Sequence, residues 1–89
     1  MTLTVRYLGQ AKGAAGRAVE AVEAADGCTA AALLRALADR HPALRGLLLT
    51  AAGEPSPSVL VFVGDAQAET PRRLRDGDAV TVLTPMAGG

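Results

Sequence analysis

One long segment of the chain, residues 29–41, has the residue spacing of an amphipathic helix. Leu33, Leu34 and Leu37 repeat at helical spacing, with charged residues on the other faces. Thr29 can cap this helix by accepting a hydrogen bond from a free backbone N–H of the first turn. Pro42 disfavours helical geometry at the preceding residue, so the helix should end at His41. The rest of the core must then come mainly from strands.

Two strands are expected before this helix. Residues 3–8 alternate with a period of two, which is typical of a half-buried strand. One face carries Leu3, Val5 and Tyr7, and the other carries Thr4, Arg6 and Leu8. The Gly- and Ala-rich stretch GQAKGAAG indicates a turn. The next segment, RAVEAVEA, places Val19 and Val22 among glutamates; we interpret it as a second strand, although its Ala and Glu content suits a helix equally well.

Three further strands are expected after the helix. The segment ALRGLLL adds a short helical turn in which Leu44, Leu47 and Leu48 close the core, and TAAGEPSPS is an irregular surface loop. The strongest strand pattern is VLVFV, residues 59–63. A weak strand follows between the turn signals Gly64-Asp65 and Asp76-Gly77, and the last strand is AVTVL, residues 79–83.

This order of elements predicts an α+β fold with the one main helix packed on one face of a mixed sheet. If the first and last strands pair in the middle of the sheet, they run parallel across the long crossover. That is the β-grasp, or ubiquitin-like, arrangement. We expect a single domain over residues 1–89, with a flexible C-terminal tail at 84–89.

Composition limits the function classes. The formal net charge is zero and aromatic residues make up 2% of the chain, which argues against a nucleic-acid partner. One cysteine and one histidine provide neither a disulfide nor a metal-ligand spacing, so we expect no metal. The first ten residues lack the apolar run of a signal peptide, and no stretch has the length of a membrane span. We therefore expect a soluble, cytoplasmic protein without a membrane partner.

The C-terminal stretch LRDGDAVTVLTPMAGG resembles the signature of the ubiquitin-like sulfur carriers, the MoaD and ThiS family. The start VRYLGQAKGAAG and the segment HPALRGLL resemble the MoaD branch. The sequence differs from that branch in three places. Gly64-Asp65 replaces the frequent Asn-Gly turn, Thr84-Pro85 replaces a pair of prolines, and Met86 replaces a common valine. None of these changes affects Gly88 or Gly89.

The resemblance implies a chemistry at the chain end. In this family a ubiquitin-activating-like adenylyltransferase transfers AMP from ATP, with Mg, to the terminal carboxylate, and a sulfur donor then displaces AMP to leave a thiocarboxylate. Gly89 would carry the sulfur, Gly88 would allow the tail to enter a narrow active site, and Pro85 would stiffen its exit from the sheet. The carrier itself would bind no cofactor. Because the residues include no nucleophile-base pair and no phosphate-binding glycine loop, we expect no catalytic activity of the chain alone.

The resemblance leaves several destinations open for the sulfur. The MoaD-like features favour the small subunit of molybdopterin synthase, whose acceptor is the large catalytic subunit. A carrier for thiamin, cysteine or tRNA thiolation is an alternative. A ubiquitin-like modifier or binding module, in which Gly89 is joined to lysines of target proteins or does nothing, is another.

Strand alternation predicts a partner-binding surface. If Val80 and Val82 face the helix, Leu8 and Leu83 remain on the solvent side of adjacent strands, beside the tail residues Pro85 and Met86. Arg72 and Arg73 begin a short basic run, which is either a charge-balanced solvated turn or a contact to an acidic partner.

Two other residues, Cys28 and His41, carry weaker functional signals. Cys28 precedes a helix N-terminus, where a thiolate is favoured, but it has no evident base or resolving thiol and is more simply a small buried residue. His41 is interpreted as a helix-end residue and not as a general base, because the sequence offers it no partner.

Overall fold

The computed structural model describes residues 1–84, so the predicted tail residues Pro85, Met86, Gly88 and Gly89 lie outside the described part. The elements are, in chain order, β1 (Thr2–Gly9), α1 (Gln10–Ala15), β2 (Val19–Glu23), α2 (Ala30–Arg40), the 3-10 turn η1 (Pro42–Leu44), α3 (Arg45–Leu48), β3 (Leu60–Val63), β4 (Ala66–Ala68) and β5 (Ala79–Thr84).

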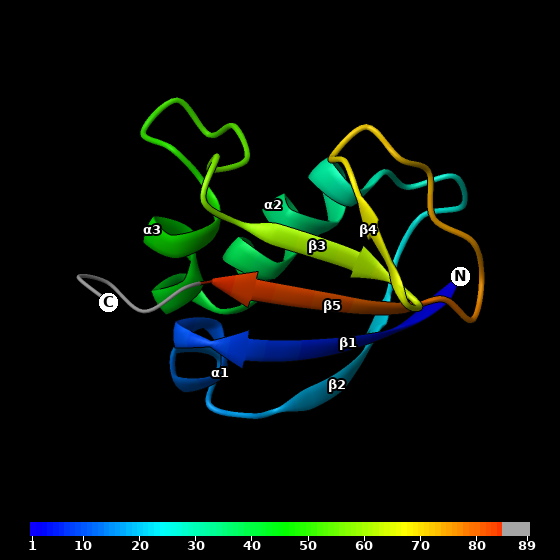
Figure 1. The fold of residues 1–89 in the computed structure, drawn as a ribbon, viewed down its shortest axis with the longest axis horizontal. Coiled ribbons are helices and arrows are strands. Elements are labelled where there is room, and N and C mark those ends of the chain that lie inside the picture. The colour runs from blue at the N-terminus through cyan, green and yellow to red at the C-terminus, as the bar shows by residue number, and fades with distance from the viewer. Residues whose placement is uncertain (85–89) are drawn as a thin grey trace.

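The strands form a mixed sheet in the order β2-β1-β5-β3-β4 (Figure 1). β1 and β5 run parallel at its centre, from Thr4 opposite Ala79 to Gly9 opposite Thr84. β2 and β3 pair antiparallel on the outer sides of β1 and β5, and β4 forms a hairpin with β3. The expected parallel pairing of the first and last strands in the middle of the sheet is confirmed.

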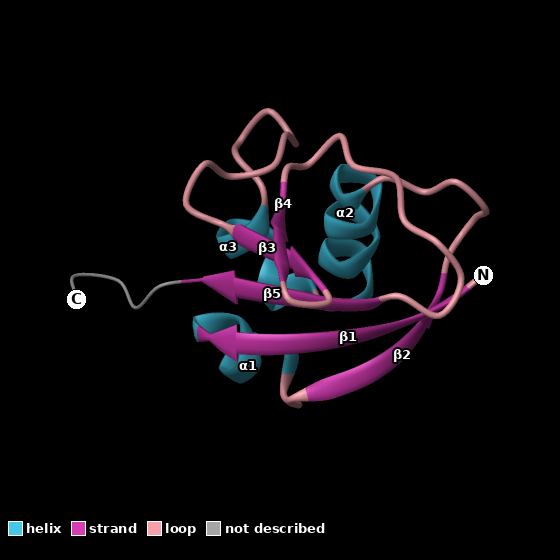
Figure 2. Cartoon of the chain, turned by 45° about the vertical axis from the view of Figure 1, so that its right-hand side comes forward, coloured by secondary structure: helices cyan, strands magenta, loops and turns pink. Residues whose placement is uncertain are grey.

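The core lies between one face of this sheet and α2, which crosses that face (Figure 2). The inner face of β1 and β5 contributes fully buried side chains, and α2 contributes its three leucines. The short segments η1 and α3 add one leucine each. The largest fully buried side chains are Tyr7, Leu3, Leu33, Leu34, Leu37, Leu44, Leu48, Val5, Val80 and Val82. Each buried aliphatic side chain of this size contributes about 1.5–3 kcal/mol relative to exposure.

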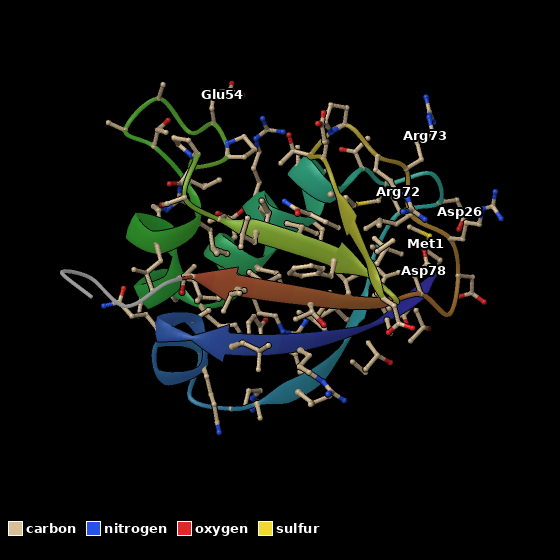
Figure 3. The ribbon with its side chains drawn as sticks, viewed as in Figure 1. Met1, Asp26, Glu54, Arg72, Arg73 and Asp78 are labelled. Atoms are coloured by element: carbon tan, nitrogen blue, oxygen red, sulfur yellow. The ribbon has the colours of Figure 1, made fainter. Side chains whose placement is uncertain are left out.

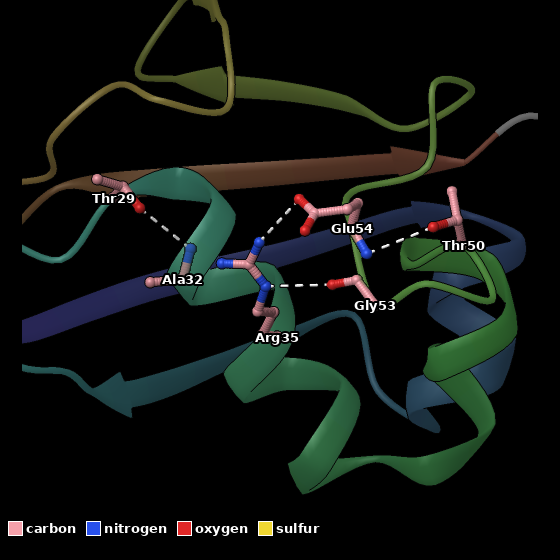
Figure 4. Close-up of polar contacts among 6 residues, drawn as sticks. All are labelled: Thr29, Ala32, Arg35, Thr50, Gly53 and Glu54. Carbon is pink, nitrogen blue, oxygen red and sulfur yellow. Dashed lines mark hydrogen bonds and ion pairs between the residues drawn. The ribbon is translucent and has the colours of Figure 1, made fainter.

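Helix α2 begins and ends as predicted. The Thr29 hydroxyl accepts a hydrogen bond from the Ala32 N–H at 3.1 Å, and His41 leaves helical geometry directly before Pro42. From the middle of the helix, Arg35 donates to the Gly53 carbonyl at 3.2 Å and to the Glu54 carboxylate at 3.1 Å (Figure 4). These contacts attach the irregular loop that precedes β3.

Three local predictions are wrong. The stretch after β1 forms the short helix α1 instead of a turn, because Ala11 and Ala15 lie one helical turn apart and are both buried. In the segment after α2, Leu49 is buried and Leu47 is only partly so, which shifts the apolar contact by two residues. Thr84, expected at the start of the tail, is the last residue of β5 and is 4% exposed.

Strand β2 also faces the core differently from its sequence pattern. Val19 is 46% exposed, whereas Glu20 is 5% exposed and lies beside Val22 on the inner face. The alternation of the strand places residues 20 and 22 together, so the valine at position 19 must point outward. A carboxylate therefore occupies a position in the core layer.

Candidate partner-binding surface and tail exit

The end of β5 is held against the junction of β1 and α1. The buried Thr84 hydroxyl accepts a hydrogen bond from the Ala11 N–H at 2.8 Å. Gly9 has a φ of 68° and a ψ of −141°, and a Cβ at this position would lie 2.0 Å from the Thr84 carbonyl oxygen. Such a backbone conformation and such a close approach both require glycine. We call Gly9, Ala11 and Thr84 the exit clamp, since it fixes the place from which the chain leaves the sheet.

Three leucines lie side by side across the outer face of the sheet, next to the exit clamp. Leu83 pairs with Leu8 on one side and with Leu60 on the other. Leu8 is 41% exposed, Leu60 is 36% exposed, and Leu83 is half-buried between them. This leucine row, Leu8, Leu83 and Leu60, confirms the predicted position of Leu8 and Leu83. Sequence reasoning missed Leu60, although alternation from the buried Val61 and Val63 places it on the outer face.

The next row of the outer face is more polar. It runs from Val19 through Arg6 and Thr81 to Phe62. Within residues 1–84, Arg6 forms no ion pair. An apolar strip with a neighbouring cation is therefore available to a partner on the side of the sheet that α2 leaves uncovered.

Arg72 and Arg73 do not join this surface. They lie in the segment that leads into β5, at the opposite end of that strand from Thr84, near Met1 and Asp26 (Figure 3). Their backbone packs against the start of α2: the Arg72 carbonyl accepts from the Ala30 N–H at 2.8 Å, and Arg73 pairs with Thr29. A partner contact through these two side chains would belong to a separate region of the surface.

The two aspartates of the same segment stabilise its turn, as the Asp-Gly-Asp pattern predicts. Asp76 accepts a hydrogen bond from the Thr2 N–H at 2.7 Å, and Asp78 accepts one from the Arg75 N–H at 2.8 Å. Gly77 between them has a φ of 85°, the left-handed region that favours glycine.

His41 has a partner that the sequence did not reveal. Its Nε2 lies 2.5 Å from one carboxylate oxygen of the buried Glu20, and the Nε of Arg40 lies 2.8 Å from the other. The Tyr7 ring meets the His41 ring edge-on, with centroids 6.0 Å apart. These contacts connect β2 to the C-terminal end of α2, so His41 serves the fold through its pairing with Glu20.

Burial also governs the acidity of Tyr7 and Cys28. Burial and, secondly, the neighbouring Glu20 carboxylate raise the pKa of Tyr7 well above its usual range. Burial raises the pKa of the Cys28 thiol, whose Sγ donates to the Thr29 carbonyl at 3.3 Å. The thiol is thus disfavoured as a nucleophile, which agrees with the interpretation of Cys28 as a small structural residue.

Two further functions find no site in the described residues. Residues 1–84 contain no group of three His, Cys, Asp or Glu side chains that could hold a metal ion. No helix within this range is long and apolar enough to cross a membrane.

The five-stranded mixed sheet, with α2 on one face, defines a ubiquitin-like β-grasp protein. The structure aligns with SAMP1 from Haloferax volcanii at a TM-score of 0.90, with 22% identity and 100% of both chains covered. A putative molybdopterin converting factor, subunit 1, from Pyrococcus furiosus aligns at a TM-score of 0.79, with 22% identity over 96% of this chain and 98% of that one. At these identities the likenesses show the fold.

A third similar structure is the Amycolatopsis orientalis BexX/CysO complex, with a TM-score of 0.70, 23% identity and coverage of 98% of this chain and 99% of that one. No curated protein matches the sequence. The ThiS family matches over residues 5–89, nearly the whole chain. The protein therefore belongs to the ThiS family of ubiquitin-like sulfur carriers, small proteins that are not catalysts on their own.

Proposed function

We propose that this protein is a sulfur carrier whose Gly89 carboxylate is adenylated and then converted to a thiocarboxylate. The observation that carries the proposal is the ThiS family match, which extends through Gly89. In the sequence, the last residues follow directly after the end of β5, which the exit clamp anchors. In this function the fold holds the base of the tail while the last residues enter the active site of another protein.

The chemistry needs two displacements. A carboxylate oxygen of Gly89 attacks the α-phosphorus of ATP and releases pyrophosphate, which makes AMP the leaving group at the carbonyl carbon. A sulfur nucleophile from the donor then attacks this carbon and releases AMP. ATP and Mg belong to the activating partner, an adenylyltransferase of the ubiquitin-activating type, and the carrier contributes Gly89 and the narrow passage provided by Gly88. Because ATP is required, we place the protein in the cytoplasm.

The leucine row is the proposed docking surface for this partner. It flanks the exit clamp, so an enzyme that covers Leu8 and Leu83 is positioned to receive Pro85, Met86 and the two glycines. Exposed apolar clusters beside a functional segment favour protein association. The charges of Arg72 and Arg73 would strengthen binding only if the partner also reaches the other end of β5.

Three finer functions are open, and a structural neighbour supports each of the first two. Similarity to a molybdopterin converting factor subunit supports a role as the small subunit of molybdopterin synthase, with the large subunit as acceptor. Similarity to SAMP1, a small archaeal modifier protein, supports conjugation of Gly89 to protein lysines as the alternative. Sulfur transfer for thiamin, cysteine or tRNA is a third destination.

The decisive experiment is the intact mass of the protein after incubation with a candidate activating enzyme, ATP, Mg and a sulfide source. We expect replacement of one oxygen by sulfur, localised to Gly89 by fragmentation, since oxidation of Met86 or Cys28 has nearly the same nominal mass. The matched control lacks Gly89 and should stay unchanged. An unmodified Gly89, with an enzyme shown to activate another carrier, would overturn the proposal. Higher-mass conjugates that disappear on deletion of Gly89 would identify the modifier instead.

A further inference from the structure

Arg6 lies in the row of the outer sheet face that adjoins the leucine row. Its direct neighbours are Val19 on β2 and Thr81 on β5, and the row continues to Phe62 on β3. Among these four residues and the three leucines, Arg6 alone carries a charge. The two rows beside the exit clamp are therefore uncharged except for one cation.

The register of the sheet keeps carboxylates away from Arg6. Neither direct neighbour is acidic, and the exposed glutamate of β2, Glu23, lies opposite Thr2, whose hydroxyl donates to its carboxylate. Within residues 1–84 the exposed Arg6 side chain forms no ion pair. A guanidinium stays protonated and presents several N–H donors in one plane. Arg6 can therefore pair with a carboxylate from outside this part of the chain.

A hollow of about 270 Å³ opens beside Arg6, on the side away from the leucine row. Its lining includes Thr4, Thr81 and the Gly64-Asp65 turn. Each threonine hydroxyl can donate one hydrogen bond. Asp65 forms no ion pair with Arg6 in the described range, and its carboxylate repels a small free anion. The hollow is thus better suited to a carboxylate that a docked protein holds against Arg6.

The spacing of the two rows sets a distance that a partner must match. Residues two positions apart on a strand share a face and lie about 6.6 Å apart. Arg6 and Leu8 are such a pair on β1. Thr81 and Leu83 are the matching pair on β5. Along these strands the order is hollow, Arg6 row, leucine row and exit clamp, so a contact to Arg6 gives a direction to the apolar contact beside it.

We propose that Arg6 is a specificity contact of the docking surface and binds an aspartate or glutamate side chain of the activating enzyme. The inference rests on the proposed function, because it takes that enzyme as the partner. The carboxylate accepts hydrogen bonds from the Arg6 guanidinium, and the hydroxyls of Thr4 and Thr81 are further donors in the same hollow. Apolar side chains of the enzyme, about 7 Å away, cover the leucine row. Arginine suits this position because it is weakly hydrated and can pair with a carboxylate through two N–H groups.

The test measures the affinity of the full chain for the candidate activating enzyme by titration calorimetry. Arg6→Gln removes the charge but keeps a polar side chain. We expect its Kd to rise at least about tenfold, because the carboxylate of the enzyme is left without its partner. Arg6→Glu should weaken binding further, since two carboxylates then face each other. Arg6→Lys should bind more tightly than Arg6→Gln, because it restores the charge.

Arg72→Gln is the matched control. It makes the same change in net charge at the opposite end of β5, and it should alter Kd by no more than about twofold because salt screens charges beyond a Debye length. Added salt should weaken the wild type more than Arg6→Gln, since screening acts on the ion pair that the variant lacks. Because Arg6 is exposed, the cooperative thermal transition should persist in each variant.

The inference is wrong if Arg6→Gln binds like the wild type, if Arg6→Gln and Arg72→Gln lose equal affinity, or if Arg6→Glu binds more tightly. A dimer of the chain alone that Arg6→Gln dissociates would assign the surface to a second copy and would also overturn it. Sulfur loading of Gly89, read from the intact mass, tests the proposed function separately. Loading with an unchanged Kd for Arg6→Gln would leave the function and remove the inference.

The opposite result is equally distinct. Binding that depends on Arg6 without any loading would support the contact and contradict the function. An enzyme that activates another carrier but neither binds nor loads the wild type would overturn both.

Discussion

The two faces of the sheet each carry residues that contradict the usual division between core and surface. The inner face buries Glu20, and the outer face exposes Leu8 and Leu60 beside Leu83. The buried carboxylate is paired with Arg40 and His41 inside the fold, whereas the leucines have no covering element in residues 1–84. The buried carboxylate of Glu20, which the fold itself pairs, therefore serves stability. The exposed leucines, which no element of the fold covers, point to a partner.

The largest expected effect comes from breaking the compensation on the inner face. Glu20→Ala should lower the free energy of unfolding by about 2–4 kcal/mol, because it leaves Arg40 and His41 without their shared carboxylate and opens space in the core layer. Chemical denaturation measures this change.

Glu23→Ala is the matched control for Glu20→Ala. Glu23 lies on the same strand but is exposed, and it should change stability by no more than about 0.5 kcal/mol. Equal losses for the two variants would show that the Glu20 contacts do not stabilise β2 against α2.

On the outer face the expected effect is on binding. Leu8→Asp or Leu83→Asp should weaken affinity for the activating enzyme by at least about tenfold, since each places a charge in the centre of an apolar contact. Affinity is measured by titration calorimetry and folding by the cooperative thermal transition, which should persist.

Thr4→Asp adds the same charge to the same face of β1, but away from the exit clamp, and should bind like the wild type. Arg72→Ala tests the separate region at the other end of β5. If Leu8→Asp and Thr4→Asp weakened binding equally, the leucine row would lose its special role. Loss of the cooperative transition with retained binding would show that Leu8 and Leu83 are core residues.

The smallest effect concerns Tyr7 on the inner face and is confined to alkaline pH. Because its pKa is raised in the folded protein, the neutral phenol adds stability below the ordinary tyrosine pKa of about 10, and this stability is lost as the unfolded chain ionises above that pH. Tyr7→Phe should therefore show a smaller loss of stability between about pH 10 and pH 11. Denaturation curves at several pH values measure the difference, and parallel pH profiles for the two proteins would contradict it.

Local patterns were sufficient for most of the fold. The alternation of residues 3–8 and 79–83, the Thr29 cap and Pro42 each act within a few residues, so the strands, α2 and the outward positions of Leu8 and Leu83 could be read directly from the sequence. The C-terminal motif supplied the family, which the match over residues 5–89 confirms.

Long-range contacts account for what could not be predicted. Glu20 and His41 are 21 positions apart, and nothing in either local pattern indicates that they meet. The helix α1 depends on burial of two alanines against distant elements, and the separation of Arg72 and Arg73 from the leucine row depends on the direction of β5. Leu60 is different, because the alternation of residues 60–63 already contained the signal.

The central position of β5 has a mechanical consequence under the proposed function, in which the tail is drawn into another active site. A pull on the tail is applied along β5, which is bonded to β1 on one side and β3 on the other. Such a load shears two hydrogen-bonded ladders at once instead of opening one from an edge. The Thr84 hydroxyl and the close approach of Gly9 meet that load first, so force applied to the tail reaches the sheet at its most strongly connected strand.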